Sequence, residues 1–84
     1  MRHFASERFW SLYDALPTEV RSLADRNYAL LKVEPRHPSL HFKRIGEVWS
    51  VRVGIHHRAL GRDVDGGILW FWIGTHADYD KLVG

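Results

Sequence analysis

The apolar residues of this 84-residue sequence change their spacing near Leu40, and this change constrains the fold more than any other feature. Before Leu40 they recur every three or four residues, which is the period of a helix with one buried face. After Leu40 apolar and polar residues alternate, as they do in strands that are buried on one face. The sequence therefore predicts helices followed by a sheet, which is the α+β class.

Two helices are predicted in the first part of the chain. Ser6 can cap the first helix, which we expect to run to about Leu16. Pro17 suits the first turn of a second helix because it has no N–H to leave unbonded, and Pro35 and Pro38 end the helical pattern. The short connection predicts an antiparallel hairpin. The apolar stripes expected to face the core are Phe9, Trp10, Tyr13 and Leu16 in the first helix, and Val20, Leu23, Ala24, Asn27, Tyr28 and Leu31 in the second.

The rest of the chain predicts three or four strands in an antiparallel meander, since the connections are short. We expect strands at 40–45, 48–54, 57–64 and 68–73, and one more helical turn between Thr75 and Val83. Asp65 followed by glycine indicates a hairpin, typically with a type I′ turn. Alternation would place Trp70 and Trp72 on one face of the last strand. The predicted fold is a single domain, residues 1–84: an antiparallel helical hairpin packed on a twisted three- to four-stranded antiparallel sheet.

Composition excludes several classes of protein. Cysteine is absent, which removes disulfides and most structural zinc sites and suits a reducing compartment. No apolar run approaches the ~20 residues needed to span a bilayer, and the first residues lack the apolar segment of a secretory signal. We therefore expect a cytoplasmic protein with no membrane partner.

The positive charge of the sequence is concentrated in its middle. Residues 35–62 contain six Lys and Arg residues but only Glu47 as a carboxylate, a net charge of +5. The segments on either side are neutral or negative, so the net charge of the whole chain is only +2. This distribution favours an anionic partner, either nucleic acid or an acidic protein. Chance clustering on a solvated surface is the alternative.

Strand alternation suggests where the cations lie. Trp49, Val51 and Val53 share one face of a predicted strand, and Arg52 stands on the other. The cations expected beside Arg52 are Lys43 and Arg58, if the strand registers agree. Arginine suits phosphate because its planar guanidinium donates two parallel hydrogen bonds and keeps its charge. Pairing of these arginines with Glu47 or Asp63 is the alternative.

Three histidines are candidates for proton transfer because imidazole titrates near neutral pH: His56, His57 and His76. A solvated or structural role is the alternative for each. His76 and Tyr79 are three residues apart on a predicted helical turn, so their side chains share a face. We expect no metal site, because the sequence has neither an HExxH motif nor an EF-hand loop.

In their order and separation, four segments of the chain resemble the RelE/ParE superfamily of type II toxin–antitoxin systems. They are Leu-Pro at 16–17, Leu-His-Phe-Lys at 40–43, residues 49–60 with Trp-Ser-Val-Arg-Val-Gly and His-Arg-Ala-Leu, and Gly-Thr-His-Ala-Asp-Tyr at 74–79. Two features depart from the family pattern. Members usually open with a strand, for which residues 1–4 are barely long enough, and Ala77 stands where several RNA-cutting members have arginine.

The resemblance implies a toxin, in many members an endoribonuclease that cuts messenger RNA on the ribosome without a cofactor. Other members act on DNA gyrase, which is the alternative target. It also implies a cognate antitoxin, which we expect to cover the basic residues with an acidic segment. The positions that match catalytic residues of RNA-cutting members are Lys43, Arg52, Arg58, His76 and Tyr79. The residues that we predict to bind RNA are Arg36, Lys43, Arg44, Arg52, His57 and Arg58.

Overall fold

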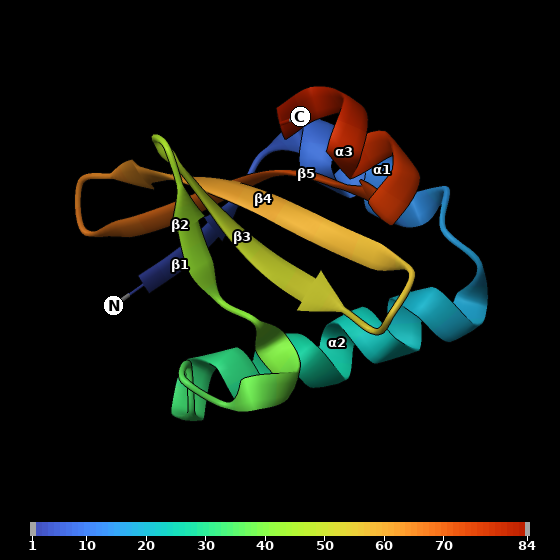
Figure 1. Cartoon of the computed structure of the whole chain (residues 1–84), viewed down its shortest axis with the longest axis horizontal. Coiled ribbons are helices and arrows are strands. Elements are labelled where there is room, and N and C mark those ends of the chain that lie inside the picture. Colours follow the sequence, from blue (N-terminus) through green and yellow to red (C-terminus); the bar gives the residue numbers. More distant parts are fainter. Residues whose placement is uncertain (1, 84) are drawn as a thin grey trace.

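The computed structural model, which describes residues 2–83, is a five-stranded sheet with helices on both faces (Figure 1). The elements in chain order are β1 (Arg2–Ala5), α1 (Glu7–Asp14), α2 (Thr18–Val33), the 3₁₀ helix η1 (Pro38–Leu40), β2 (Lys43–Ile45), β3 (Val48–Val53), β4 (His57–Val64), β5 (Gly67–Thr75) and α3 (His76–Val83). The strand order is β1-β5-β4-β3-β2. The predicted α+β class is confirmed. No helix within residues 2–83 is long and apolar enough to cross a bilayer.

The two predicted helices of the hairpin are both present. The Ser6 hydroxyl accepts a hydrogen bond from the Phe9 amide at 3.1 Å and caps α1, as predicted. α1 ends at Asp14, two residues earlier than expected, because the amides of Ala15 and Leu16 bond to carbonyls three residues back and tighten the last turn. Each helix packs mainly on its own part of the sheet, α1 on β5 and α2 on β3.

The strand predicted from residue 40 begins only at Lys43. Pro38 starts a turn of 3₁₀ helix, in which the His37 ring nitrogen Nδ1 accepts a hydrogen bond from the Ser39 amide at 3.2 Å. His41 follows in the left-handed conformation, with φ of 43°. These local hydrogen bonds replace the strand-to-strand backbone hydrogen bonds that the alternating pattern predicted for residues 40–42. They also hold the fully buried Leu40 in the core.

The sheet has more strands than predicted, and it is mixed. Strands β2 to β5 form the predicted antiparallel meander, but β1 adds a fifth strand that pairs in parallel with β5. The register places Arg2 opposite Gly67 and Ala5 opposite Trp70. Gly67 permits this pairing, since a Cβ at that position would collide with the backbone of Arg2.

A β-bulge corrects the predicted orientation of the aromatic strand. Leu60 pairs with Trp72 and the next residue of β4 pairs with Trp70, so Phe71 is an extra residue in β5. Trp70 therefore faces α1 and α2, whereas Trp72 faces α3, and the prediction of a common face was wrong. The hairpin turn between β4 and β5 also differs from the expected type I′. That type needs positive φ at both central residues, and of Asp65 and Gly66 only Gly66 has it.

The sheet separates two hydrophobic cores. The larger packs against residues of α1 and α2, and the smaller lies between the sheet and α3. The buried residues of the larger core are Leu31, Leu40, Val51, Val53, Ala59, Ile68, Trp70 and Ile73. The smaller core consists of Leu60, Trp72 and Tyr79. The face of the sheet toward α3 is thus only partly covered, which leaves room for polar side chains.

Candidate anion-binding site

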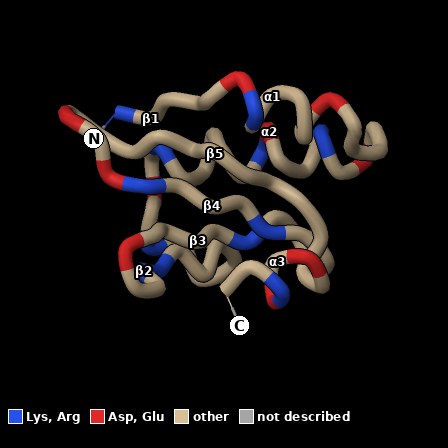
Figure 2. The backbone as a smooth tube through the Cα atoms, turned by 90° about the horizontal axis from the view of Figure 1, so that it is seen from above, with Lys and Arg blue, Asp and Glu red and all other residues tan. Residues whose placement is uncertain are grey.

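The structure brings three predicted site residues to the sheet face that carries α3. Arg52 on β3 lies directly opposite Arg58 on β4. Lys43 on β2 pairs with Ser50, which shares this face of β3 with Arg52. Figure 2 shows the basic positions of β2, β3 and β4 on neighbouring strands. We call the surface formed by Lys43, Arg52, Arg58 and the adjoining His41 the basic face.

Arg58 is buried without a counter-charge. Its side chain is only 5% exposed, its Nη1 donates one hydrogen bond to the Ser50 hydroxyl at 3.2 Å, and its Nε is buried with no partner. Within residues 2–83 no carboxylate lies within 4.0 Å of Lys43, Arg52 or Arg58. A buried guanidinium without a carboxylate partner costs several kcal/mol, so among residues 2–83 Arg58 is a candidate for contact with an anion.

The expected alternative, pairing of these arginines with local carboxylates, is not what the structure shows. Asp63 instead forms an ion pair with Arg44 and accepts a hydrogen bond from the Trp49 indole at 2.9 Å. These two donors hold the pKa of the Asp63 carboxyl below its usual value, Trp49 contributing more than Arg44.

His41 belongs to the basic face, although sequence reasoning did not select it. The positive charge of Arg52 lowers the pKa of this exposed imidazole most, and desolvation, Arg58 and Lys43 lower it further. These effects favour the neutral imidazole of His41, which can accept a proton. His41 has a left-handed backbone conformation and lies in the turn before β2. The spacing of apolar residues predicts helices and strands, so it gives no indication of a residue in such a turn.

His76 and Tyr79 share one face of α3, as predicted. Their rings stack with centroids 5.5 Å apart, and the Cζ atom of Arg58 lies 5.1 Å from the centroid of the Tyr79 ring. His76 is half-exposed, with its Nε2 atom 3.7 Å from an Asp80 carboxylate oxygen. Tyr79 is buried against the smaller core. α3 thus connects a solvent-accessible imidazole to the buried guanidinium through an aromatic ring.

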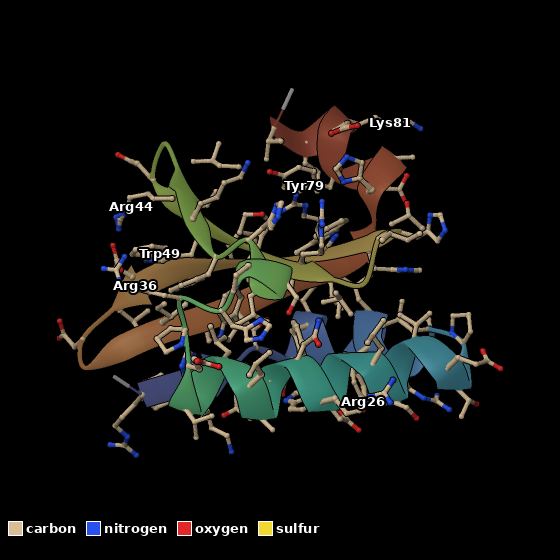
Figure 3. All side chains as sticks on the ribbon, turned by 60° about the horizontal axis from the view of Figure 1, so that its bottom comes forward. Arg26, Arg36, Arg44, Trp49, Tyr79 and Lys81 are labelled. Atoms are coloured by element: carbon tan, nitrogen blue, oxygen red, sulfur yellow. The ribbon has the colours of Figure 1, made fainter. Side chains whose placement is uncertain are left out.

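Three predicted RNA-binding residues lie away from the basic face. Arg44 points to the opposite side of β2 from Lys43, with its Cζ atom 4.6 Å from the centroid of the Trp49 ring. Arg36 is exposed in the loop before η1, and Figure 3 shows it near Trp49 and Arg44, far from Tyr79. His57 pairs with a strand residue that faces α2, and burial, followed by the charge of His56, lowers its pKa.

Among residues 2–83, no group of three or more His, Cys, Asp or Glu side chains is arranged to hold a metal ion. The chemistry that the described site offers is electrostatic and acid–base. Two arginines and a lysine can bind a phosphate or carboxylate, and His41 and His76 can exchange protons beside them.

Folding lowers the proton affinity of three histidines, and this predicts acid sensitivity. The pKa values of His3 and His57 fall mainly through burial, and that of His41 falls mainly through the charge of Arg52. The folded chain therefore binds fewer protons than the unfolded chain near and below about pH 6.5, so stability falls as pH decreases through that range. Differential scanning calorimetry should give a lower melting temperature at about pH 5.5 than at about pH 7.5. The difference should shrink in a His41→Asn, His57→Asn double variant, and equal melting temperatures for the wild type would contradict the prediction.

The fold is a small α+β domain with a basic face on its sheet, and comparison with known families specifies its class. Residues 18–81 match the family model described as ParE-like toxin domain. The chain belongs to this family, within the RelE/ParE superfamily of toxins. A comparison with curated protein sequences finds no match.

Solved structures of related toxins share the fold at low sequence identity. A chain of the RelB–RelE antitoxin–toxin complex from Methanococcus jannaschii is 12% identical with a TM-score of 0.73, covering 96% of this chain and 99% of that one. The YoeB/ParE toxin from Agrobacterium tumefaciens is 15% identical with a TM-score of 0.68, covering 90% and 99%. YafQ from E. coli is 13% identical with a TM-score of 0.69, covering 93% and 96%. These likenesses extend over nearly the full length of each chain.

Proposed function

We propose that this chain is the toxin of a type II toxin–antitoxin system and acts in the cytoplasm as a metal-independent endoribonuclease on ribosome-bound messenger RNA. The observation that carries the proposal is the buried guanidinium of Arg58, which lies opposite Arg52 and has no carboxylate within 4.0 Å among the described residues, 2–83. Phosphate in an RNA backbone would supply the missing negative charge. The family match supports the toxin, and the acid–base groups around the arginines support RNA cleavage.

The proposed reaction is attack of a ribose 2′-hydroxyl on its adjacent phosphate. A base takes the hydroxyl proton as the new O–P bond forms, and an acid protonates the departing 5′-oxygen as its bond to phosphorus breaks. The products are a 2′,3′-cyclic phosphate and a 5′-hydroxyl. His41 or Lys43 would transfer one of these two protons, and His76 or Tyr79 would transfer the other. Arg52 and Arg58 would stabilise the extra negative charge of the phosphorane.

The protein partner that we propose is a cognate antitoxin. The RelB–RelE complex, which shares this fold, contains an antitoxin bound to its toxin. An acidic antitoxin segment would suit the unneutralised cations of the basic face. Co-expression from the native operon should therefore rescue growth that this chain alone arrests, and normal growth at confirmed levels of the chain alone would refute the toxin proposal.

Loss of proton transfer should separate RNA cleavage from binding. We expect the variant that removes the acting group, His76→Ala or Tyr79→Phe, to reduce RNA cleavage by about 10²-fold or more, because a positioned acid or base contributes about 10²–10⁴-fold. Both variants should still bind antitoxin, since His76 is half-exposed and Phe keeps the buried ring of Tyr79.

Mapping the 5′ ends of cellular transcripts after induction would measure this, with a gyrase supercoiling assay run in parallel. New 5′ ends with wild type that disappear with His76→Ala or with Tyr79→Phe would support the proposal. Unchanged transcripts together with inhibited supercoiling would reject it in favour of a gyrase-directed toxin. Burial of Tyr79, one of the two groups proposed to transfer the second proton, is the observation that favours this alternative.

A further inference from the structure

A side-chain hydrogen bond connects α2 to one of the arginines of the basic face. The Nδ2 atom of Asn27 on α2 donates to the backbone carbonyl oxygen of Arg52 on β3, at 3.0 Å. Asn27 is half-buried and is the one amide in the stripe of α2 that the sequence predicted to face the core. Its hydrogen bond therefore reaches a residue of the candidate site from the helix side of the sheet.

The Arg52 carbonyl lies beyond the end of the neighbouring strand β2. Strand pairing between β2 and β3 extends only as far as Lys43 and Ser50. Continued by two residues, this register would bring His41 opposite Arg52, but His41 has a left-handed conformation and precedes β2. Backbone carbonyls inside a protein need a hydrogen-bond donor, and Asn27 supplies one where the pairing with β2 has stopped.

α2 contacts this end of β3 at a second point. Leu23 packs so closely on Gly54 that a Cβ at this glycine would collide with the leucine side chain. Leu23 and Asn27 are four residues apart, so they share one face of α2. Their contacts lie on either side of Val53, the last residue of β3. The helix thus holds the segment that carries Arg52 as it enters the turn into β4.

Arg52 depends on its backbone for its position more than Arg58 does. Arg58 is buried, contacts the Tyr79 ring and donates to the Ser50 hydroxyl. Arg52 is half-exposed, and among residues 2–83 no carboxylate lies within 4.0 Å of it. The two arginines are directly opposite each other, and like charges in such a pair repel. A contact that fixes the backbone of Arg52 opposes this repulsion.

We propose that Asn27 is a positioning residue for Arg52: its hydrogen bond to the Arg52 carbonyl fixes the guanidinium in the place where it holds a phosphate of the RNA. The inference rests on the proposed function, because the role of Arg52 as a phosphate ligand belongs to that proposal. Asn27 itself touches no reacting atom and acts through the backbone. A small displacement of a group that orients the reacting phosphate lowers the rate steeply.

Two variants of α2 separate positioning from packing. Asn27→Leu removes the N–H donor but keeps a side chain of similar size and a high helix propensity. Leu30→Ala is the matched control, because Leu30 also packs on the larger core from α2 and has no donor in its side chain. If Asn27→Leu does not fold, Asn27→Ala removes the same donor with less bulk.

The first readout is the titration of His41, followed by NMR and assigned from the signal that His41→Asn lacks. Arg52 is the largest cause of the lowered pKa of His41, ahead of desolvation and the charges of Arg58 and Lys43. A guanidinium that is free to move spends more time in solvent, where its charge is screened. We therefore expect the pKa of His41 to rise toward its ordinary value in Asn27→Leu and to stay at the wild-type value in the control.

The second readout is single-turnover cleavage of ribosome-bound messenger RNA by equal amounts of folded protein. We expect the rate to fall about tenfold or more in Asn27→Leu and less than about twofold in Leu30→Ala. Wild-type behaviour of Asn27→Leu in either readout would overturn the proposal. Equal losses of cleavage in the two variants would also overturn it, because Asn27 would then be a packing residue only.

The two readouts also distinguish this inference from the proposed function. The titration of His41 requires no RNA, so it decides whether Asn27 positions Arg52 even if the wild type cleaves no messenger RNA. An inactive wild type would count against the proposed function alone.

Discussion

Replacing Arg58 with methionine should abolish toxicity and leave the fold as stable as before, or more stable. Methionine has a similar length and brings no charge. The variant therefore removes the cost of burying a guanidinium that contacts Tyr79 and has no carboxylate partner in the part of the chain that the structure describes. Exchanges of buried charges for apolar residues are neutral or stabilising by about 1–4 kcal/mol. RNA cleavage should fall by about 10²–10³-fold, the usual cost of removing one group that stabilises the transition-state charge.

Chemical denaturation and an RNA cleavage assay on the same preparations check both halves of this expectation. Arg62→Met is the matched control, since Arg62 is exposed on the same strand and its loss should change stability by less than about 0.5 kcal/mol. A large loss of stability in Arg58→Met would mean that the arginine holds the sheet and α3 together. The buried charge would then be structural, and the main support for an anion site would be lost.

The positions of Arg52 and Arg58 followed from the sequence because strand alternation and short hairpins left little freedom. The Arg52–Arg58 pair requires only that two adjacent strands meet around the turn at Gly54, whose φ is +67°. The same local reasoning predicted Ser6 as a cap and the shared face of His76 and Tyr79. Each of these features is determined by residues that are close in sequence.

The features that the sequence did not predict depend on distant contacts or on local irregularities. β1 has only four residues and becomes a strand by pairing with β5, more than sixty residues later. The bulge between Leu60 and Gly61 places Trp70 and Trp72 on opposite faces of the sheet, and alternation has no signal for an inserted residue. His41 reaches the basic face through a left-handed backbone conformation after a 3₁₀ turn. Periodicity describes regular elements, so it misses the residues that lie where these elements end.

Arg44 shows how the same limits affect the candidate site. It is adjacent to Lys43 in sequence and was grouped with it by charge, yet successive strand residues point to opposite faces. The sequence does not fix the first residue of β2, so alternation alone could not tell whether Lys43 or Arg44 points to the open face of the sheet. The structure places Arg44 over Trp49 and beside Asp63, away from the basic face.

Tyr79 should be the residue on which α3 depends. It is the only buried residue of this eight-residue helix, and an isolated helix of this length is unstable in water. Tyr79→Ala would remove the ring from its contacts with Leu60 and Trp72, so we expect a loss of about 3–5 kcal/mol of stability. Tyr79→Phe keeps those contacts and should therefore cost much less than Tyr79→Ala.

Urea unfolding and amide hydrogen exchange across α3 would measure this dependence. Leu82→Ala is the matched control on the same helix, because Leu82 is 59% exposed and its truncation should cost less than about 0.5 kcal/mol. In Tyr79→Ala the amides of α3 should exchange much faster than in either other variant, since the helix would detach from the sheet. If Tyr79→Ala unfolds at the same urea concentration as Leu82→Ala, α3 is held by something other than this ring. The stack of His76 and Tyr79 over Arg58 would then not fix the position of His76 beside the basic face.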